Sequence, residues 1–126
     1  MSRYRVLLLE KDPESLGKSA VLLEHAGYKV EICPSPSDCL WLTRKFHPDC
    51  VVLDLPYAGF EMLSSLSDYA PDVVIVAYVN PDEIIPASQV VHCGVKKILQ
   101  RHFADASFLD SVQQAIAEQH FKRQAA

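Results

Sequence analysis

PDCVVLDL, residues 48–55, contains a run of four apolar residues that ends at Asp54. No polar residue alternates with the apolar ones, which favours a strand covered on both faces, as in a parallel sheet. A second stretch, VLLLEKDP at residues 6–13, repeats this arrangement, with the acidic residues Glu10 and Asp12 after its apolar run. The two stretches together predict buried parallel strands with carboxylates at their ends.

Three further short apolar runs lie at residues 28–32, 73–77 and 98–99. Residues 28–32 alternate polar with apolar, so we expect this strand at an edge of the sheet, and the other two runs in its interior. The segments between the runs have helical spacing, and three of them begin with a capping residue followed by proline, at Asp12, Ser35 and Asn80. Pro86 interrupts the segment that follows Asn80 and predicts a kink there. A short helix is expected around Leu63, and the last helix from about residue 105.

Strand and helix alternate five times along the 126 residues. This order predicts an α/β fold with a doubly wound, five-stranded parallel sheet and helices on both of its faces. Neither a linker nor a repeat divides the chain, so one domain spanning residues 1–126 is expected. In such sheets ligands bind at the carboxyl ends of the strands, and the residues that follow each strand are therefore the ones to examine for chemistry.

Composition excludes several classes of partner. The formal net charge is -4 and the basic residues are scattered, which gives no basis for binding nucleic acid or an anionic membrane. The apolar runs are too short to cross a bilayer and the first residues do not lead into a signal sequence, so a cytoplasmic location is predicted. The four cysteines lack CxxC spacing, and buried thiols are expected in place of a metal site or disulfides.

Side chains suited to chemistry follow four of the expected strands: Glu10-Lys11-Asp12, Asp54-Leu55-Pro56, Ala77-Tyr78 and Arg101-His102-Phe103. In these segments the chain resembles the receiver domains of two-component response regulators, which have a flavodoxin-like fold. The resemblance covers nearly the whole chain. It implies that Asp54 is the phosphoacceptor and that Glu10 and Asp12 belong to an acidic pocket, where Mg²⁺ bridges the acceptor and phosphoryl oxygens.

The chain departs from the family pattern at several of these positions. Lys11 replaces the acidic residue that usually binds the metal directly, and a charged ammonium cannot act as a ligand. By the resemblance, Ala77 stands where a hydroxyl should contact the phosphoryl group, Ile98 where an aromatic switch residue is common, and Arg101 where a lysine is expected. Gly59 also follows Asp54 sooner than the family's glycine, which shortens the loop after the acceptor.

Three functions are compatible with this pattern. The favoured one is a degenerate receiver that is not an enzyme, has no cofactor or bound metal and acts through protein contacts. The second is an ordinary receiver phosphorylated on Asp54, with Mg²⁺ held by Glu10 and Asp54. The third, a small flavodoxin-like or nucleotide-binding enzyme, is disfavoured because no glycine-rich loop follows any strand.

Each singled-out residue also has a structural interpretation. Glu10 and Asp12 could simply begin a helix, with Asp12 as its cap. Asp54 could be a structural carboxylate paired with Lys11 or Arg101, and we predict that Lys11 lies within ion-pair reach of Asp54.

The resemblance also implies the partners, which would be a sensor kinase, an output domain or a second copy of the chain. A homodimer would form through the fourth helix, fifth strand and fifth helix, which correspond to residues 84–91, 96–99 and 107–118.

Overall fold

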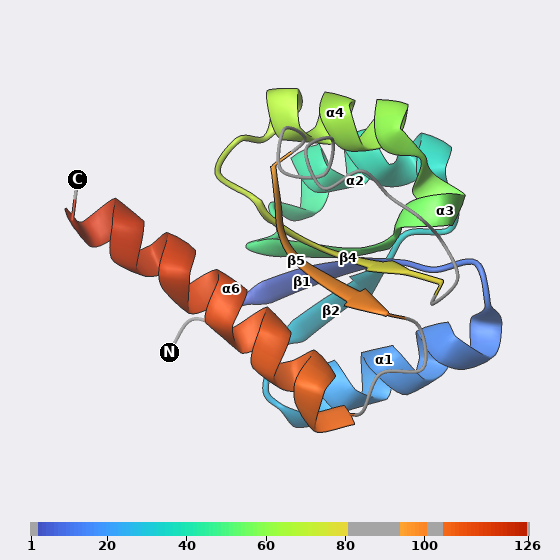
Figure 1. Cartoon of the computed structure of the whole chain (residues 1–126), viewed down its shortest axis with the longest axis horizontal. Coiled ribbons are helices and arrows are strands. Elements are labelled where there is room, and N and C mark those ends of the chain that lie inside the picture. The colour runs from blue at the N-terminus through green and yellow to red at the C-terminus, as the bar shows by residue number, and fades with distance from the viewer. Residues whose placement is uncertain (1–2, 81–93, 101–104, 126) are drawn as a thin grey trace.

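A computed structural model describes residues 3–80, 94–100 and 105–125 of the chain, without the side chains of residues 122–125. Five parallel strands form one sheet in the order β2-β1-β3-β4-β5 (Figure 1). Their bounds are Arg5–Leu9 for β1, Lys29–Ile32 for β2, Cys50–Asp54 for β3, Val74–Val79 for β4 and Val95–Gln100 for β5. The predicted fold class, a doubly wound five-stranded parallel sheet, is confirmed.

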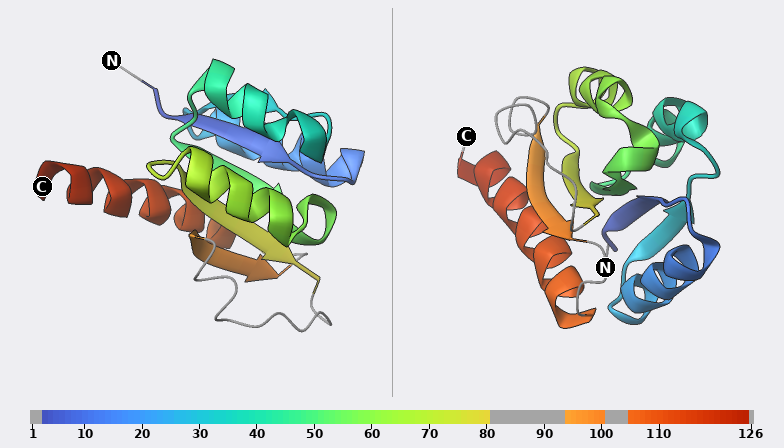
Figure 2. Two further views of the ribbon diagram at one scale, coloured as in Figure 1. Left: turned by 90° about the horizontal axis from the view of Figure 1, so that it is seen from above. Right: turned by 45° about the vertical axis from the view of Figure 1, so that its right-hand side comes forward.

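Helices cover both faces of the sheet. One face carries α2 (Cys39–Phe46), the short α3 (Leu55–Ala58) and α4 (Phe60–Tyr69), and the other carries α1 (Pro13–His25) and α6 (Asp105–Ala125) (Figure 1). A short 3₁₀ helix, η1 (Pro36–Asp38), leads into α2. α6 has 21 residues, about 31 Å of helix, and its last turns extend beyond the sheet (Figure 2). Among the described residues, no helix is both long and apolar enough to cross a membrane.

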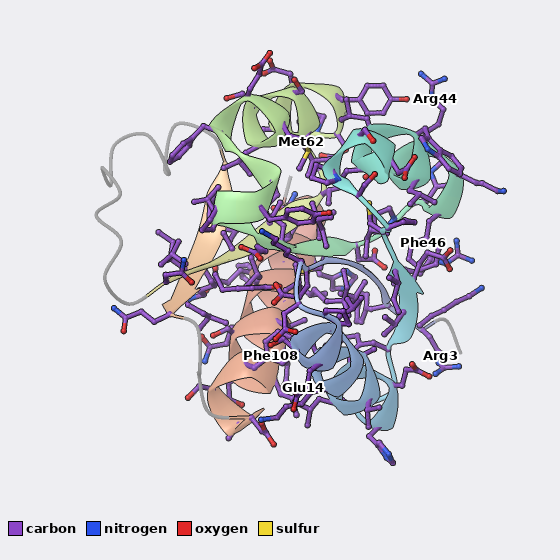
Figure 3. The ribbon with its side chains drawn as sticks, turned by 90° about the vertical axis from the view of Figure 1, so that its right-hand side faces the viewer. Arg3, Glu14, Arg44, Phe46, Met62 and Phe108 are labelled. Atoms are coloured by element: carbon purple, nitrogen blue, oxygen red, sulfur yellow. The ribbon has the colours of Figure 1, made fainter. Side chains whose placement is uncertain are left out.

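The core has two layers, one on each face of the sheet. Successive residues of each central strand belong alternately to one layer and to the other. Successive side chains of a strand point to opposite faces of the sheet. On the side of α2 and α4 lie Leu7, Leu9, Val51, Leu53, Ile75 and Ala77. On the side of α1 and α6 lie Val6, Leu8, Cys50, Val52, Val74, Val76 and Tyr78. Figure 3 shows the layers from the side, with Met62 of α4 above the sheet and Phe108 of α6 below it.

Several expectations about individual elements can now be compared with the structure. The strand at residues 28–32 was expected at an edge, and β2 is an edge strand. The helix start at Asp12 is confirmed, because the Asp12 side chain accepts the backbone N–H of Glu14 at the first turn of α1. The Ser35 segment begins with η1 and not directly with an α-helix.

Two expectations about β5 and α3 were wrong, and two others concern residues that the structure does not describe. β5 was predicted to be covered on both faces, but it is the other edge strand, and Ile98 is 48% exposed. α3 was not predicted, although Asp54 and Pro56 form a similar pattern, a cap followed by proline with one residue between them. The helix start expected after Asn80 and the kink at Pro86 lie outside the described residues.

Candidate functional site

The carboxyl ends of β1, β3 and β4 meet at one edge of the sheet. A pocket of about 560 Å³ opens there, and its described lining residues are Lys11, Asp12, Asp54, Pro56, Tyr57 and Asn80. These residues come from the segments that follow the first, third and fourth strands, as expected for a parallel α/β sheet. The sequence therefore predicted the place of the pocket and three of its acidic or basic side chains, Lys11, Asp12 and Asp54.

Asp54 ends β3 and at the same time caps α3. Its side chain is 2% exposed. One carboxylate oxygen, Oδ1, accepts the backbone N–H of Tyr57 at 3.4 Å, in the first turn of α3. The other, Oδ2, accepts the backbone N–H of Lys11 at 3.5 Å. Both contacts are long for hydrogen bonds, but they connect Asp54 to the two segments that flank it. Asp54 therefore has a structural role whatever else it does.

Lys11 does not form the ion pair that the sequence suggested. Its side chain is exposed, and it is the backbone amide that lies against Asp54. The two ion pairs recorded within the described part of the chain are elsewhere: one joins Lys18 to Asp105, and the other joins Lys97 to Glu118. The prediction of an ion pair between Lys11 and Asp54 was therefore wrong, since the exposed Lys11 side chain lines the pocket without a recorded ion pair to Asp54. Arg101, the other expected partner of Asp54, lies outside the described residues.

Glu10 is buried beside Tyr78, a strand-end residue to which the sequence assigned no role of its own. Its side chain is 7% exposed, and its Oε2 accepts a hydrogen bond from the hydroxyl of Tyr78, which is 6% exposed. The Tyr78 hydroxyl also lies 3.5 Å from the backbone carbonyl oxygen of Leu9. A signal was present in the sequence, since an aromatic hydroxyl stands next to Ala77 at the end of the expected strand. The sequence did not indicate on which face of the sheet that hydroxyl lies.

The alternation along β4 decides which of its last residues faces Asp54. Tyr78 is paired in register with Asp54 and packs in the layer of α1 and α6. Ala77 is paired with Leu53 and packs in the opposite layer, under α2 and α4. The sequence suggested that Ala77 stands where receivers have a hydroxyl residue. The structure corrects this position to Tyr78, since the side chain of Ala77 faces away from Asp54. Ile98, the other expected switch position, is paired with Ala77.

The carboxylates do not form a suitable cage for a metal ion. Mg²⁺ requires oxygen ligands in near-octahedral geometry. The oxygens of Asp12 accept hydrogen bonds from the Glu14 amide and the Ser15 hydroxyl at the start of α1, and Glu10 is bound by Tyr78. Within the ranges that the structure covers, no three His, Cys, Asp or Glu side chains gather in a group that could hold a metal ion. The donor set therefore does not fit a resident Mg²⁺ ion.

Comparison with protein families gives a clear result. A family model described as "Response regulator receiver domain" matches residues 6–113. A comparison with curated proteins found no match.

Solved structures share the fold at low sequence identity. A response regulator receiver domain protein (CheY-like) from Methanospirillum hungatei JF-1 has a TM-score of 0.89 and 18% identity, over 96% of this chain and 99% of that chain. The chemotaxis response regulator CheY4 of Vibrio cholerae has a TM-score of 0.81 and 18% identity, over 90% of this chain and 99% of that one.

NtrX from Brucella abortus has a TM-score of 0.90 and 16% identity, over 98% of this chain but 28% of NtrX. The chain therefore spans little more than a quarter of that protein. At such identities, these comparisons concern the fold alone.

Proposed function

Because the chain belongs to the response regulator receiver domain family, we propose that it is a non-enzymatic, cytoplasmic signalling module in which phosphorylation of Asp54 is impaired. It acts through contacts with other proteins. The observation that carries the proposal is the state of the acidic pocket, where each carboxylate already has a structural partner. Asp54 caps α3, Asp12 caps α1 and Glu10 binds Tyr78.

The chemistry of phosphorylation explains why this matters. A carboxylate is a weak nucleophile, and its reaction with a phosphoryl donor depends on a divalent cation that neutralises the charge developing on the phosphoryl oxygens. Here the position next to Glu10 is occupied by Lys11, whose ammonium cannot ligate a cation. The charge of Lys11 could attract an anionic donor, but it supplies no bridge between the donor and Asp54. Transfer to Asp54 is therefore expected to be slow or absent.

The test is a reaction of the full chain with a small acyl phosphate and Mg²⁺, followed by intact mass measurement. We expect no phosphoryl adduct on the wild type under conditions that modify an ordinary receiver treated in parallel. Asp54→Asn is the matched control, since it preserves size and removes the acceptor. An adduct that forms on the wild type and is lost in Asp54→Asn would overturn the proposal and favour the ordinary receiver.

The partner surface follows from family membership and from exposure. In the proposed role, a sensor kinase, an output domain or a second copy binds the side of the domain formed by β5 and α6. On β5, Ile98 and Gln100 are exposed, which leaves an apolar and a polar side chain available at this edge.

Binding there should not depend on Asp54. Wild type and Asp54→Asn should therefore have equal affinity for a partner or for a second copy, with and without the acyl phosphate. A phosphodonor effect of tenfold or more on the wild type alone, which corresponds to about 1.4 kcal/mol of coupling, would contradict this expectation.

A further inference from the structure

The hydrogen bond between Tyr78 and Glu10 joins two strands that are not neighbours. The sheet order places β3 between β1 and β4, and adjacent strands lie about 4.8 Å apart. Leu9 is in register with Leu53, and Asp54 is in register with Tyr78, so Glu10, which directly follows β1, lies at the same level of the sheet as Asp54 and Tyr78. The side chains of Glu10 and Tyr78 therefore meet over β3, on the face to which the alternation along β3 assigns Asp54.

Glu10 and Tyr78 meet in a buried environment. Both side chains are more than nine-tenths buried, and a hydrogen bond is electrostatically stronger where water is excluded. Glu10 is not among the described residues that line the pocket, whereas Lys11, Asp12 and Asp54 are. A cation that entered the pocket would therefore meet Asp54 without Glu10, unless the hydrogen bond from Tyr78 broke first. If it broke, the Tyr78 hydroxyl would keep only its long contact of 3.5 Å to the Leu9 carbonyl oxygen, and Glu10 would lose this hydrogen bond.

We propose that Tyr78 is a positioning residue that holds Glu10 in the core and thereby excludes divalent cations from the pocket, independently of the charge of Lys11. We call the hydrogen bond from the Tyr78 hydroxyl to Glu10, which spans β3, the latch. The inference deepens the proposed function and rests on it, because it explains why the acidic pocket does not assemble a metal site. It also means that Lys11 is one of two obstacles, so restoring a carboxylate at position 11 is not sufficient to create metal affinity.

The experiment measures cation affinity directly. Mn²⁺ binding, followed by electron paramagnetic resonance, and Mg²⁺ binding, followed by calorimetry, are compared for full-length Lys11→Asp and for Lys11→Asp combined with Tyr78→Phe. The phenylalanine keeps the ring and removes only the hydroxyl. We expect the double variant to bind each ion at least tenfold more tightly than Lys11→Asp. The matched control combines Lys11→Asp with Tyr28→Phe, which removes a phenol from the segment before β2, and it should bind like Lys11→Asp alone.

A second measurement keeps the test decisive if Tyr78→Phe does not fold. A buried, hydrogen-bonded phenol proton exchanges slowly and can be followed by nuclear magnetic resonance. In Lys11→Asp the Tyr78 hydroxyl proton should persist when Mg²⁺ is added. Ion binding while that proton persists would show that the latch does not exclude the cation.

The two proposals fail in different ways. Equal affinities of Lys11→Asp and the double variant would overturn the latch and leave the proposed function intact. A phosphoryl adduct on the wild type would overturn the proposed function itself.

Discussion

Replacement of Gly59 by alanine should destabilise the domain through the backbone alone. Gly59 is the single residue between α3 and α4, with φ 85° and ψ 155°, a conformation that is essentially restricted to glycine. A Cβ atom at Gly59 would meet no atom within 4 Å, so no steric clash contributes. The strain cannot relax easily, because its N–H donates to the Leu55 carbonyl at 2.8 Å and its carbonyl accepts the Leu63 N–H at 3.2 Å.

The expected cost is about 2 kcal/mol, within the range of roughly 1 to 3 kcal/mol for such a backbone conformation. For a domain of this size, each kcal/mol corresponds to roughly 4 °C in melting temperature, so Gly59→Ala should melt about 8 °C below the wild type. The assay is thermal unfolding followed by circular dichroism, together with urea unfolding, which should give a lower midpoint and an unchanged m-value.

Gly17→Ala is the matched control, because it makes the same chemical change with the opposite expected sign. Gly17 lies inside α1, and a Cβ atom there also meets nothing within 4 Å. Alanine is favoured over glycine in a helix interior by about 1 kcal/mol, so Gly17→Ala should melt roughly 4 °C above the wild type. If Gly59→Ala melts at or above the wild-type temperature while Gly17→Ala behaves as expected, the argument from backbone strain at Gly59 is refuted.

Three further predictions concern charge and pH. Burial raises the pKa of the Cys50 thiol, so as pH rises the unfolded chain loses the thiol proton at a lower pH than the folded chain does. The free energy of unfolding should therefore fall above the ordinary thiol pKa of about 8.5. Urea unfolding at increasing pH should show a weaker fall for Cys50→Ala than for the wild type. The hydrogen bond from Trp41 lowers the pKa of Asp38, so the contact between the two side chains should persist on acidification until below about pH 3.9. The fluorescence of Trp41, the sole tryptophan, reports this contact. A fluorescence change centred at or above that pH, or one that is unchanged in Asp38→Ala, would contradict the expectation. The half-exposed ion pair between Lys97 and Glu118 should contribute less than about 1 kcal/mol, so a larger loss on Lys97→Met would mean that this side chain has another role in packing.

The sequence predicted the sheet well because buried parallel strands have a strong signature. The runs at residues 6–9 and 50–53 are apolar on both faces, and both became central strands. The capping role of Asp12 was also predictable, since a cap depends on its own neighbours in the chain. β5 was less predictable, because its apolar run consists of Ile98 and Leu99 alone, and two residues are too few to show whether polar and apolar positions alternate.

The candidate site was predictable in place but not in its contacts. The strand ends indicated the pocket at Asp54, whereas the contact between Glu10 and Tyr78 depends on the register of strands far apart in the sequence. A one-residue difference in register moves a side chain to the other face, and this is why Ala77 was taken for the position that Tyr78 occupies.

The alternation along β4 has a consequence for how this site can change in evolution. A shift of β4 by one residue relative to β3 would move Ala77 into the place of Tyr78 and Tyr78 into the place of Val79. The methyl group of Ala77 would then face Glu10, and the ring of Tyr78 would move into the layer beneath α4. Such a shift would remove the hydrogen bond from Tyr78 to Glu10 without substituting either residue, so the pocket depends on the register of β4 as much as on the identity of its side chains.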